Sequence, residues 1–113
     1  MKKTESLRKN RDFLKLYRSG KFFVGRNIVL YIKENKTQTN RLGISTAKNF
    51  GNSVERNRIR RLIRENYREL ESQLPTGWDI IFSARKKKDA QLPSFQEVGK
   101  EMRYLTRKIG LLS

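Results

Sequence analysis

The longest periodic stretch of the chain reads NSVERNRIRRLIRENYRELESQL, residues 52–74. Its apolar residues recur with the 3.6-residue period of an α-helix, which predicts one buried face. They are Ile59, Leu62, Ile63, Tyr67, Leu70 and Leu74. Asn52 and Glu55 have the spacing of a capping box, and Pro75 follows the last apolar position. We therefore expect a helix from about residue 53 to about residue 74.

The opposite face of this helix is nearly all positive. At about 100° per residue, one arc of the helix carries five polar or basic side chains. They are Asn57, Arg60, Arg61, Arg64 and Arg68 (the arginine arc), with Arg56 and Arg58 flanking it in the first turns. A guanidinium group binds phosphate oxygens bidentately and stacks on bases. An ordinary solvated face mixes charge signs, so this arc favours a phosphate-bearing partner.

The composition leads to the same class of partner. The chain has 113 residues, 27 of them Lys or Arg and 11 Asp or Glu, which gives a formal charge of +16. Such a charge is typical of nucleic-acid binders, and an anionic membrane surface is the main alternative. No apolar run is long enough to span a bilayer. Cysteine is absent as well, so we expect a cytoplasmic protein.

The sequence offers little catalytic chemistry. Histidine and cysteine are both absent, which removes the commonest general base and the thiolate metal ligands. No pair of carboxylates has the spacing of a metal site, and neither a P-loop nor a dinucleotide-binding glycine motif occurs. We expect no catalytic residue on this chain and no metal ion bound by the protein alone.

The elements around the long helix indicate a single α+β domain over residues 1–113, in the order αβββαβα. A first helix is expected over residues 11–18, with Asn10 as N-cap and Gly20 as the closing C′ residue. Strands are expected at residues 22–24, 28–32, 41–46 and 78–84, with a hairpin loop at 34–40 and a lysine-rich loop at 86–88. Ser94 and Glu97 predict the start of a last helix, whose buried stripe is Val98, Met102, Leu105 and Ile109.

Aromatic residues are interspersed with the basic ones. Phe13 and Tyr17 are one helical turn apart, and Phe22, Phe23 and Tyr31 follow. Single-stranded nucleic acid stacks on such rings beside a basic groove. Core packing is the alternative for any one of them.

These residues carry a family resemblance. Residues 51–54, the triplet Arg56-Asn57-Arg58 and residues 60–65 together resemble the signature of the ribonuclease P protein component. The resemblance extends to residues 7–9, 12–13, 17, 20, 41–45 and 79–81. Ser53, where the family usually has Ala, and Asn49, where a second Lys is common, depart from it.

The resemblance implies a fold like domain 2 of ribosomal protein S5, with a left-handed βαβ crossover through the long helix. It also implies an accessory subunit of an endoribonuclease. The RNA subunit, present 1:1 and holding Mg²⁺, would remove the 5′ leader of precursor tRNA. Arg56, Asn57, Arg58, Arg60 and Arg61 would contact that RNA, and we extend this set along the arc to Arg64 and Arg68.

The leader would lie in a cleft between the sheet and the first and long helices. Phe13, Tyr17 and Lys48 match cleft positions of the family, and we add Tyr31 from the aromatic group. Neither DNA nor a membrane is expected as a partner.

Three other classes of protein share some of these features. A ribosomal or other structural RNA-binding protein has the same charge. A DNA-binding regulator would need a helix-turn-helix, and the strands expected around the long helix disfavour one. A protein-only nuclease lacks the necessary ligands.

Overall fold

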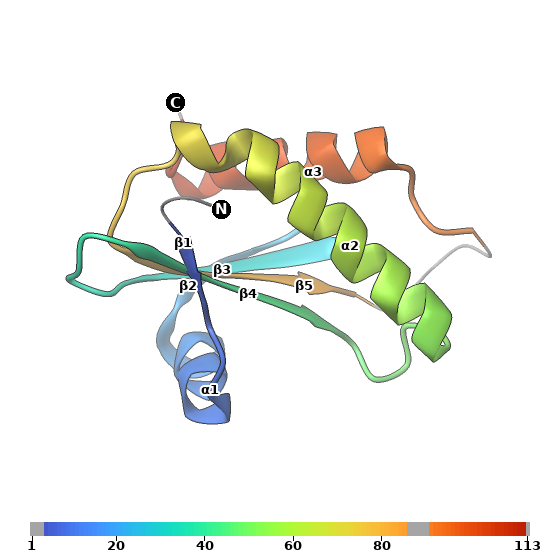
Figure 1. Ribbon diagram of the computed structural model, residues 1–113, viewed down its shortest axis with the longest axis horizontal. Helices are drawn as coiled ribbons and strands as arrows, with labels where there is room; N and C mark the ends of the chain where they lie inside the picture. The colour runs from blue at the N-terminus through green and yellow to red at the C-terminus, as the bar shows by residue number, and fades with distance from the viewer. Residues whose placement is uncertain (1–3, 86–90, 113) are drawn as a thin grey trace.

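The computed structural model describes residues 4–85 and 91–112 (Figure 1). The elements, in chain order, are β1 (Thr4–Ser6), α1 (Asn10–Ser19), β2 (Lys21–Val24), β3 (Ile28–Glu34), β4 (Asn40–Thr46), α2 (Ser53–Leu70), the 3-10 turn η1 (Glu71–Gln73), β5 (Trp78–Ala84) and α3 (Phe95–Ile109). The expected α+β order is confirmed, and one three-residue strand, β1, precedes it. The predicted loop at residues 86–88 lies outside the described residues.

The five strands form one mixed sheet in the order β1-β4-β5-β3-β2. Helices α2 and α3 lie side by side over one face (the α2/α3 face), and α1 lies on the other (the α1 face), as Figure 1 shows. The parallel neighbours β4 and β5 are joined through α2. In Figure 1, β4 runs rightward, α2 returns above it, and β5 lies farther from the viewer. The crossover is therefore left-handed, against the right-handed rule that about 98% of such units obey.

The hairpin predicted at residues 34–40 is wrong. Strands β3 and β4 are not neighbours, because β5 lies between them and pairs with both, antiparallel to β3 and parallel to β4. Five of the seven residues of β5 are buried. A strand with apolar side chains on both faces is stabilised most at the centre of the sheet, where both faces are covered. The connection from β3 to β4 therefore passes the end of β5, a strand that comes later in the chain.

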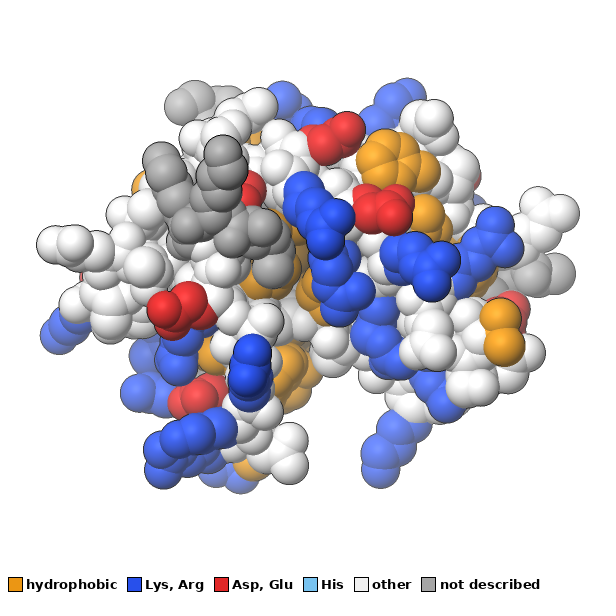
Figure 2. Space-filling model, in the orientation of Figure 1, with side chains coloured by type: hydrophobic (Ala, Val, Ile, Leu, Met, Phe, Trp, Pro, Cys, Tyr) orange, Lys and Arg blue, Asp and Glu red, His pale blue; other side chains and the backbone are white. Residues whose placement is uncertain are grey.

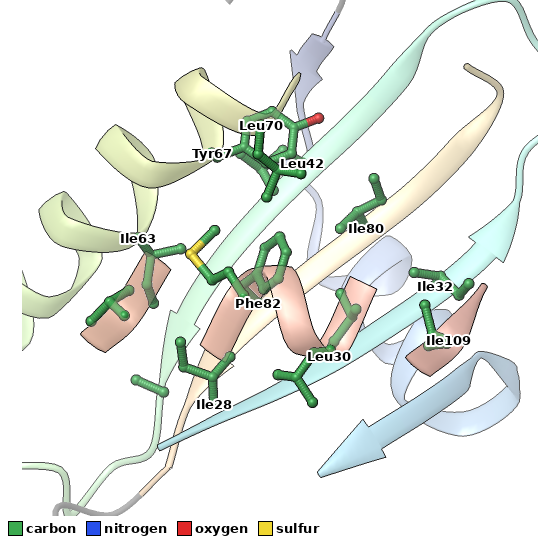
Figure 3. Close-up of a cluster of buried hydrophobic side chains, with 14 of the residues drawn as sticks. Ile28, Leu30, Ile32, Leu42, Ile63, Tyr67, Leu70, Ile80, Phe82 and Ile109 are labelled. Atoms are coloured by element: carbon green, nitrogen blue, oxygen red, sulfur yellow. The ribbon is translucent and has the colours of Figure 1, made fainter. Parts of the chain in front are cut away.

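The main core lies between the sheet and the two helices above it (Figure 3). Alternate residues of β3, namely Ile28, Leu30 and Ile32, point into it and are at most 3% exposed. The apolar stripe predicted on the long helix packs against them, with Leu62 only partly buried. Tyr67 contacts Phe82 edge-on, with ring centroids 6.4 Å apart.

Both ends of α1 differ from expectation. Asn10 is the first helical residue, and the N-cap position is Lys9, which makes no capping hydrogen bond through its side chain. Gly20 follows the helix with an extended backbone (φ −76°), so left-handed geometry does not explain it. A Cβ atom at Gly20 would lie 2.6 Å from the Leu16 carbonyl oxygen and 3.0 Å from that of Ile32. Glycine is needed there because the chain passes close to both carbonyl oxygens as it turns from α1 into β2.

Candidate nucleic-acid interface

The helix that carries the arginine arc is rigidly placed. The Asn52 side chain accepts a hydrogen bond from the Glu55 amide (2.9 Å), and the Glu55 carboxylate accepts one from the Asn52 amide (3.2 Å). This capping box satisfies two amides at the helix start, and the acidic group there suits the helix dipole. Ile59, Ile63 and Tyr67 are at most 1% exposed and fix the rotation of the helix on the sheet. The positions of the arginines therefore follow from the burial of the opposite face.

One side of the arginine arc faces the C-terminal half of β4. Arg60 donates to the Asn57 side-chain oxygen (2.6 Å) and to the Thr46 hydroxyl (3.4 Å). Arg56 donates to the Gly51 carbonyl (2.5 Å). Because these partners are neutral, the bonds orient the guanidinium groups while leaving their charge available for an anion.

The remaining arginines spread around the helix. Arg58 points away from β4. It lines a pocket with Pro93 and Ser94, which belong to the segment that leads into α3. Arg61 and Arg68 are exposed to solvent. The two flanking residues, Arg56 and Arg58, thus point toward different neighbours, and only part of the predicted set faces the sheet.

Lys48 lies at the same end of the molecule. It is exposed on the short segment between β4 and α2. Phe50, two residues later, is 3% exposed and anchors this segment in the main core. The anchored turn holds Lys48 between the C-terminal end of β4 and the start of the arginine helix.

An aromatic row crosses the α1 face of the sheet. Phe13 and Tyr17 come from α1 and Tyr31 from β3. Ring centroids are 6.3 Å apart for Phe13 and Tyr17 and 4.9 Å for Tyr17 and Tyr31. Tyr17 is 38% exposed, so much of its surface is open to a ligand. The structure therefore brings together three of the four residues expected in the cleft.

Small residues under the row allow the rings to approach the sheet. A Cβ atom on Gly43 would lie 2.7 Å from two carbons of the Phe13 ring, so glycine permits this contact. The Tyr17 hydroxyl makes a 2.9 Å hydrogen bond with the Ser45 hydroxyl, which donates to the Ser83 hydroxyl, also at 2.9 Å. Sequence reasoning missed both serines. Their alternation with core residues is visible in the sequence, but their neighbours depend on the strand order.

The phenol of Tyr31 keeps its proton at neutral pH. Burial raises the pKa of Tyr31 above its ordinary value, and the neighbouring Tyr17 raises it further. An ionised phenol would repel phosphate, but a tyrosine of ordinary pKa is already neutral at this pH, and the upward shift only widens that margin.

A polar anchor ties α1 to the sheet. Arg41 donates to both carboxylate oxygens of Asp79 (2.8 and 2.6 Å) and lies 3.5 Å from the Asp12 carboxylate on α1. Asn35 donates to Asp79 as well (3.0 Å). Burial by itself would raise the pKa of Asp79, but the hydrogen bonds from Arg41 and Asn35 bring it below its ordinary value. The anchor lies beside the row and stabilises the helix that supplies two of its rings.

A pocket of about 160 Å³ joins the aromatic row to the arginine arc. It is lined by Phe13 of α1, by Arg64 of α2 and by Ser6, Leu7, Leu42 and Ile44. Strand β1 pairs with β4 only as far as Leu42, and beyond it no strand in the described residues covers the outer edge of β4. In Figure 2 the surface is hollowed between α1 and the start of α2, and blue Lys and Arg side chains gather on both sides.

The described residues supply no evident metal site and no membrane-spanning element. Within residues 4–85 and 91–112, no three His, Cys, Asp or Glu side chains gather as metal ligands would. Nor is any helix of these segments long and apolar enough to cross a bilayer.

Comparison with known proteins places the chain in one family. The family model described as Ribonuclease P matches residues 1–110. The chain belongs to the ribonuclease P protein family. The ribonuclease P protein component of Clostridioides difficile (strain 630) is 40% identical over 108 residues, which cover 94% of this chain and 92% of that one. That of Clostridium perfringens (strain 13 / Type A) is 41% identical over 113 residues, with coverages of 94% and 89%.

Solved ribonuclease P proteins share the fold. The protein from Staphylococcus aureus superposes with a TM-score of 0.83 at 31% identity, over 96% of this chain and 97% of that one. The protein from Thermotoga maritima gives 0.80 at 32% identity, over 91% and 96%. The two departures from the family pattern, Ser53 and Asn49, are both exposed here. Neither side chain is part of the core.

Proposed function

We propose that this chain is the protein subunit of ribonuclease P, a cytoplasmic ribonucleoprotein that removes the 5′ leader of precursor tRNA. The observation that carries the proposal is the pocket where Phe13 and Arg64 meet, between the aromatic row and the arginine arc. A stacking surface next to a row of guanidinium groups suits single-stranded RNA that emerges from a structured RNA.

The arginine arc and its flanks are proposed to contact the RNA subunit, in a 1:1 complex. The residues are Arg56, Asn57, Arg58, Arg60, Arg61, Arg64 and Arg68. Their spread around α2 suits a partner that wraps a convex helix, since phosphates on more than one strand segment can reach them. The net charge of +16 provides the long-range attraction.

The aromatic row and Lys48 are proposed to bind the leader. Phe13, Tyr17 and Tyr31 would stack on its bases, and Lys48 would contact its backbone. Mature tRNA has no leader, so these contacts would favour precursor over product. The hydroxyl chain from Tyr17 through Ser45 to Ser83 holds the central ring in place.

Cleavage itself is proposed to take place on the RNA subunit with its Mg²⁺. The protein would contribute binding, and its positive charge would lower the repulsion between leader and RNA subunit. Purified protein, rigorously freed of RNA, should then leave precursor tRNA intact in Mg²⁺ buffer. Adding a ribonuclease P RNA at low Mg²⁺ should give cleavage at the mature 5′ end. Specific cleavage by the RNA-free protein would contradict this assignment.

The leader contact is tested with Phe13→Ala. In the holoenzyme, its affinity for leader-bearing precursor should fall by about 1–3 kcal/mol, the range for one lost stacking contact. Affinity for mature tRNA should hardly change. Leu14→Ala is the matched control, because Leu14 is the next residue on α1 and is 48% exposed. Equal losses for precursor and mature tRNA would mean that Phe13 is a packing residue and that the leader does not lie on this row.

A further inference from the structure

Phe22 is an aromatic side chain that the packing of the domain leaves largely uncovered. It lies on β2, the edge strand of the sheet, and is 57% exposed. All four residues of β2 are exposed, although three of them are apolar. Apolar side chains on an edge strand, whose outer side is unpaired, favour aggregation, and proteins usually place charges there instead. An exposed phenyl ring at this place therefore points to a binding role.

Phe22 continues the aromatic row. Its ring centroid lies 5.8 Å from that of Tyr31, with the planes 33° apart. The strand register explains the alignment, because Phe22 pairs with Tyr31, Tyr31 with Ile81, and Ile81 with Gly43. These four positions form one line across β2, β3, β5 and β4 on the α1 face. Phe13 covers one end of the line, over Gly43, and Phe22 forms the other.

The spacing of the row suits an unstacked single strand. Three strand separations of about 4.8 Å give the line a length of about 14 Å. Neighbouring ring centroids are 4.9 to 6.3 Å apart. That is wider than the rise of about 3.4 Å between stacked bases along one strand of duplex DNA. A strand on this row is therefore extended, with its bases on the rings instead of on each other.

The two ends of the row have different neighbours. The Phe13 end adjoins Arg64, in the part of the molecule proposed to contact the RNA subunit. Phe22 lies at the opposite edge of the sheet, three strands away. A leader that leaves the RNA subunit along this row reaches Phe22 last.

We infer that Phe22 is a stacking platform for the protein-bound leader nucleotide farthest from the cleavage site. This inference rests on the proposed function, since it extends the leader path to the β2 edge of the sheet. Phe22 then sets how many leader nucleotides the protein senses. The neighbouring Phe23 takes no part, because successive side chains of a strand alternate and Phe23 points to the face where α3 contacts β2.

The test is a leader-length series with the assembled holoenzyme. Dissociation constants are measured for precursor tRNAs whose leaders grow one nucleotide at a time, at fixed salt and Mg²⁺. For the wild type, affinity should rise with length and then level off. For Phe22→Ala, it should level off at least one nucleotide earlier, with a final affinity about 5- to 10-fold weaker, the lower part of the range for one stacked base. With shorter leaders the two proteins should bind equally.

Further variants separate stacking from packing. Phe22→Trp and Phe22→Tyr keep a ring and should retain the wild-type profile, whereas Phe22→Leu keeps apolar volume without a ring and should behave like Phe22→Ala. Phe23→Ala, on the same strand, should bind like wild type, and thermal melting checks that each variant is folded.

Three outcomes would overturn the inference. A wild-type profile for Phe22→Ala, with normal leader dependence, would do so while leaving the proposed function in place. Equal weakening for all leaders and for mature tRNA would show a general loss of binding. If wild-type affinity did not depend on the leader at all, the proposed function would fail as well.

Discussion

The two faces of the central sheet are built from alternate residues of the same strands, yet they are covered very differently. On the α2/α3 face, two long helices close over side chains such as Leu30 and Phe82, which have no exposed surface. On the α1 face, one ten-residue helix covers a cluster with only three buried members among the described residues, Leu7, Leu16 and Ile81. The rest of that face carries the Arg41–Asp79 anchor, serines, a glycine and partly exposed rings.

The difference shows how the domain separates stability from binding. Burial of apolar area is the main favourable term in folding, and most of it lies on the α2/α3 face. The α1 face contributes less of the buried apolar area, so its aromatic rings can stay exposed with little loss of folding stability. A binding surface can thus occupy the incompletely covered side of a sheet whose other side is fully packed.

The comparison is tested most strongly by two adjacent isoleucines on β5. Ile80 points to the α2/α3 face and Ile81 to the α1 face, and neither has exposed surface. Ile80→Ala should lower the free energy of unfolding by about 3–5 kcal/mol, and Ile81→Ala by about 2–3 kcal/mol, since the small α1 cluster can collapse into the space. Denaturant unfolding of both variants measures this. Equal losses would show that the two faces contribute alike to stability.

The polar anchor of α1 is tested by Asp79→Asn. Loss of the charge-assisted bonds with Arg41 should cost about 1.5–3 kcal/mol of stability at neutral pH. Because the pKa of Asp79 is lowered in the folded state, its contribution is complete above the unfolded pKa of about 4 and is lost as the pH falls through the folded value. Unfolding curves between neutral pH and pH 3 should show the variant converging on wild type. A constant difference across this range would exclude the ion pair as the source of the stabilisation.

A third prediction concerns the arginine arc, where the effect should fall mainly on binding and only slightly on stability. Arg60→Ala should weaken binding to the RNA subunit and reduce the slope of log affinity against log salt by about one, as expected for one lost phosphate contact. Arg107→Ala, on the exposed side of α3, is the control and should keep the wild-type slope. Weaker binding with an unchanged slope would point to stacking or to misfolding, which circular dichroism distinguishes.

The smallest effect is expected from Tyr17→Phe, which keeps the ring and removes the hydroxyl. Loss of the bond to Ser45 should cost about 0.5–1 kcal/mol of stability. Leader affinity should stay close to that of wild type if stacking dominates. A loss as large as that expected for Phe13→Ala would instead show that the hydroxyl itself contacts the leader.

Much of this molecule followed from local patterns in the sequence. The 3.6-residue period gave α2 and its arginine arc, and the Asn52 and Ser94 capping boxes form as expected. The strand over residues 78–84 was recognised from its apolar run. Such features depend on neighbours a few residues apart, so periodicity and capping chemistry suffice to find them.

The end of α1 and the three-residue strand β1 were not predictable in the same way. Thr4–Ser6 has too little pattern to indicate a strand, and it pairs with β4 only because the fold brings the two together. Gly20 was correctly placed at the end of α1 but for a different reason, since the approach of Ile32 requires knowledge of the packing.

The sequence by itself determined the composition of the binding surface: the charge, the arginine helix and the aromatic residues. Only the tertiary structure decided where they meet. The insertion of β5 between β3 and β4 sets the line from Gly43 to Phe22, and the crossover through α2 brings Arg64 to Phe13. The physical reason is that strand pairing joins residues dozens of positions apart, and its energy depends on the burial of both sheet faces at once, which no local pattern records.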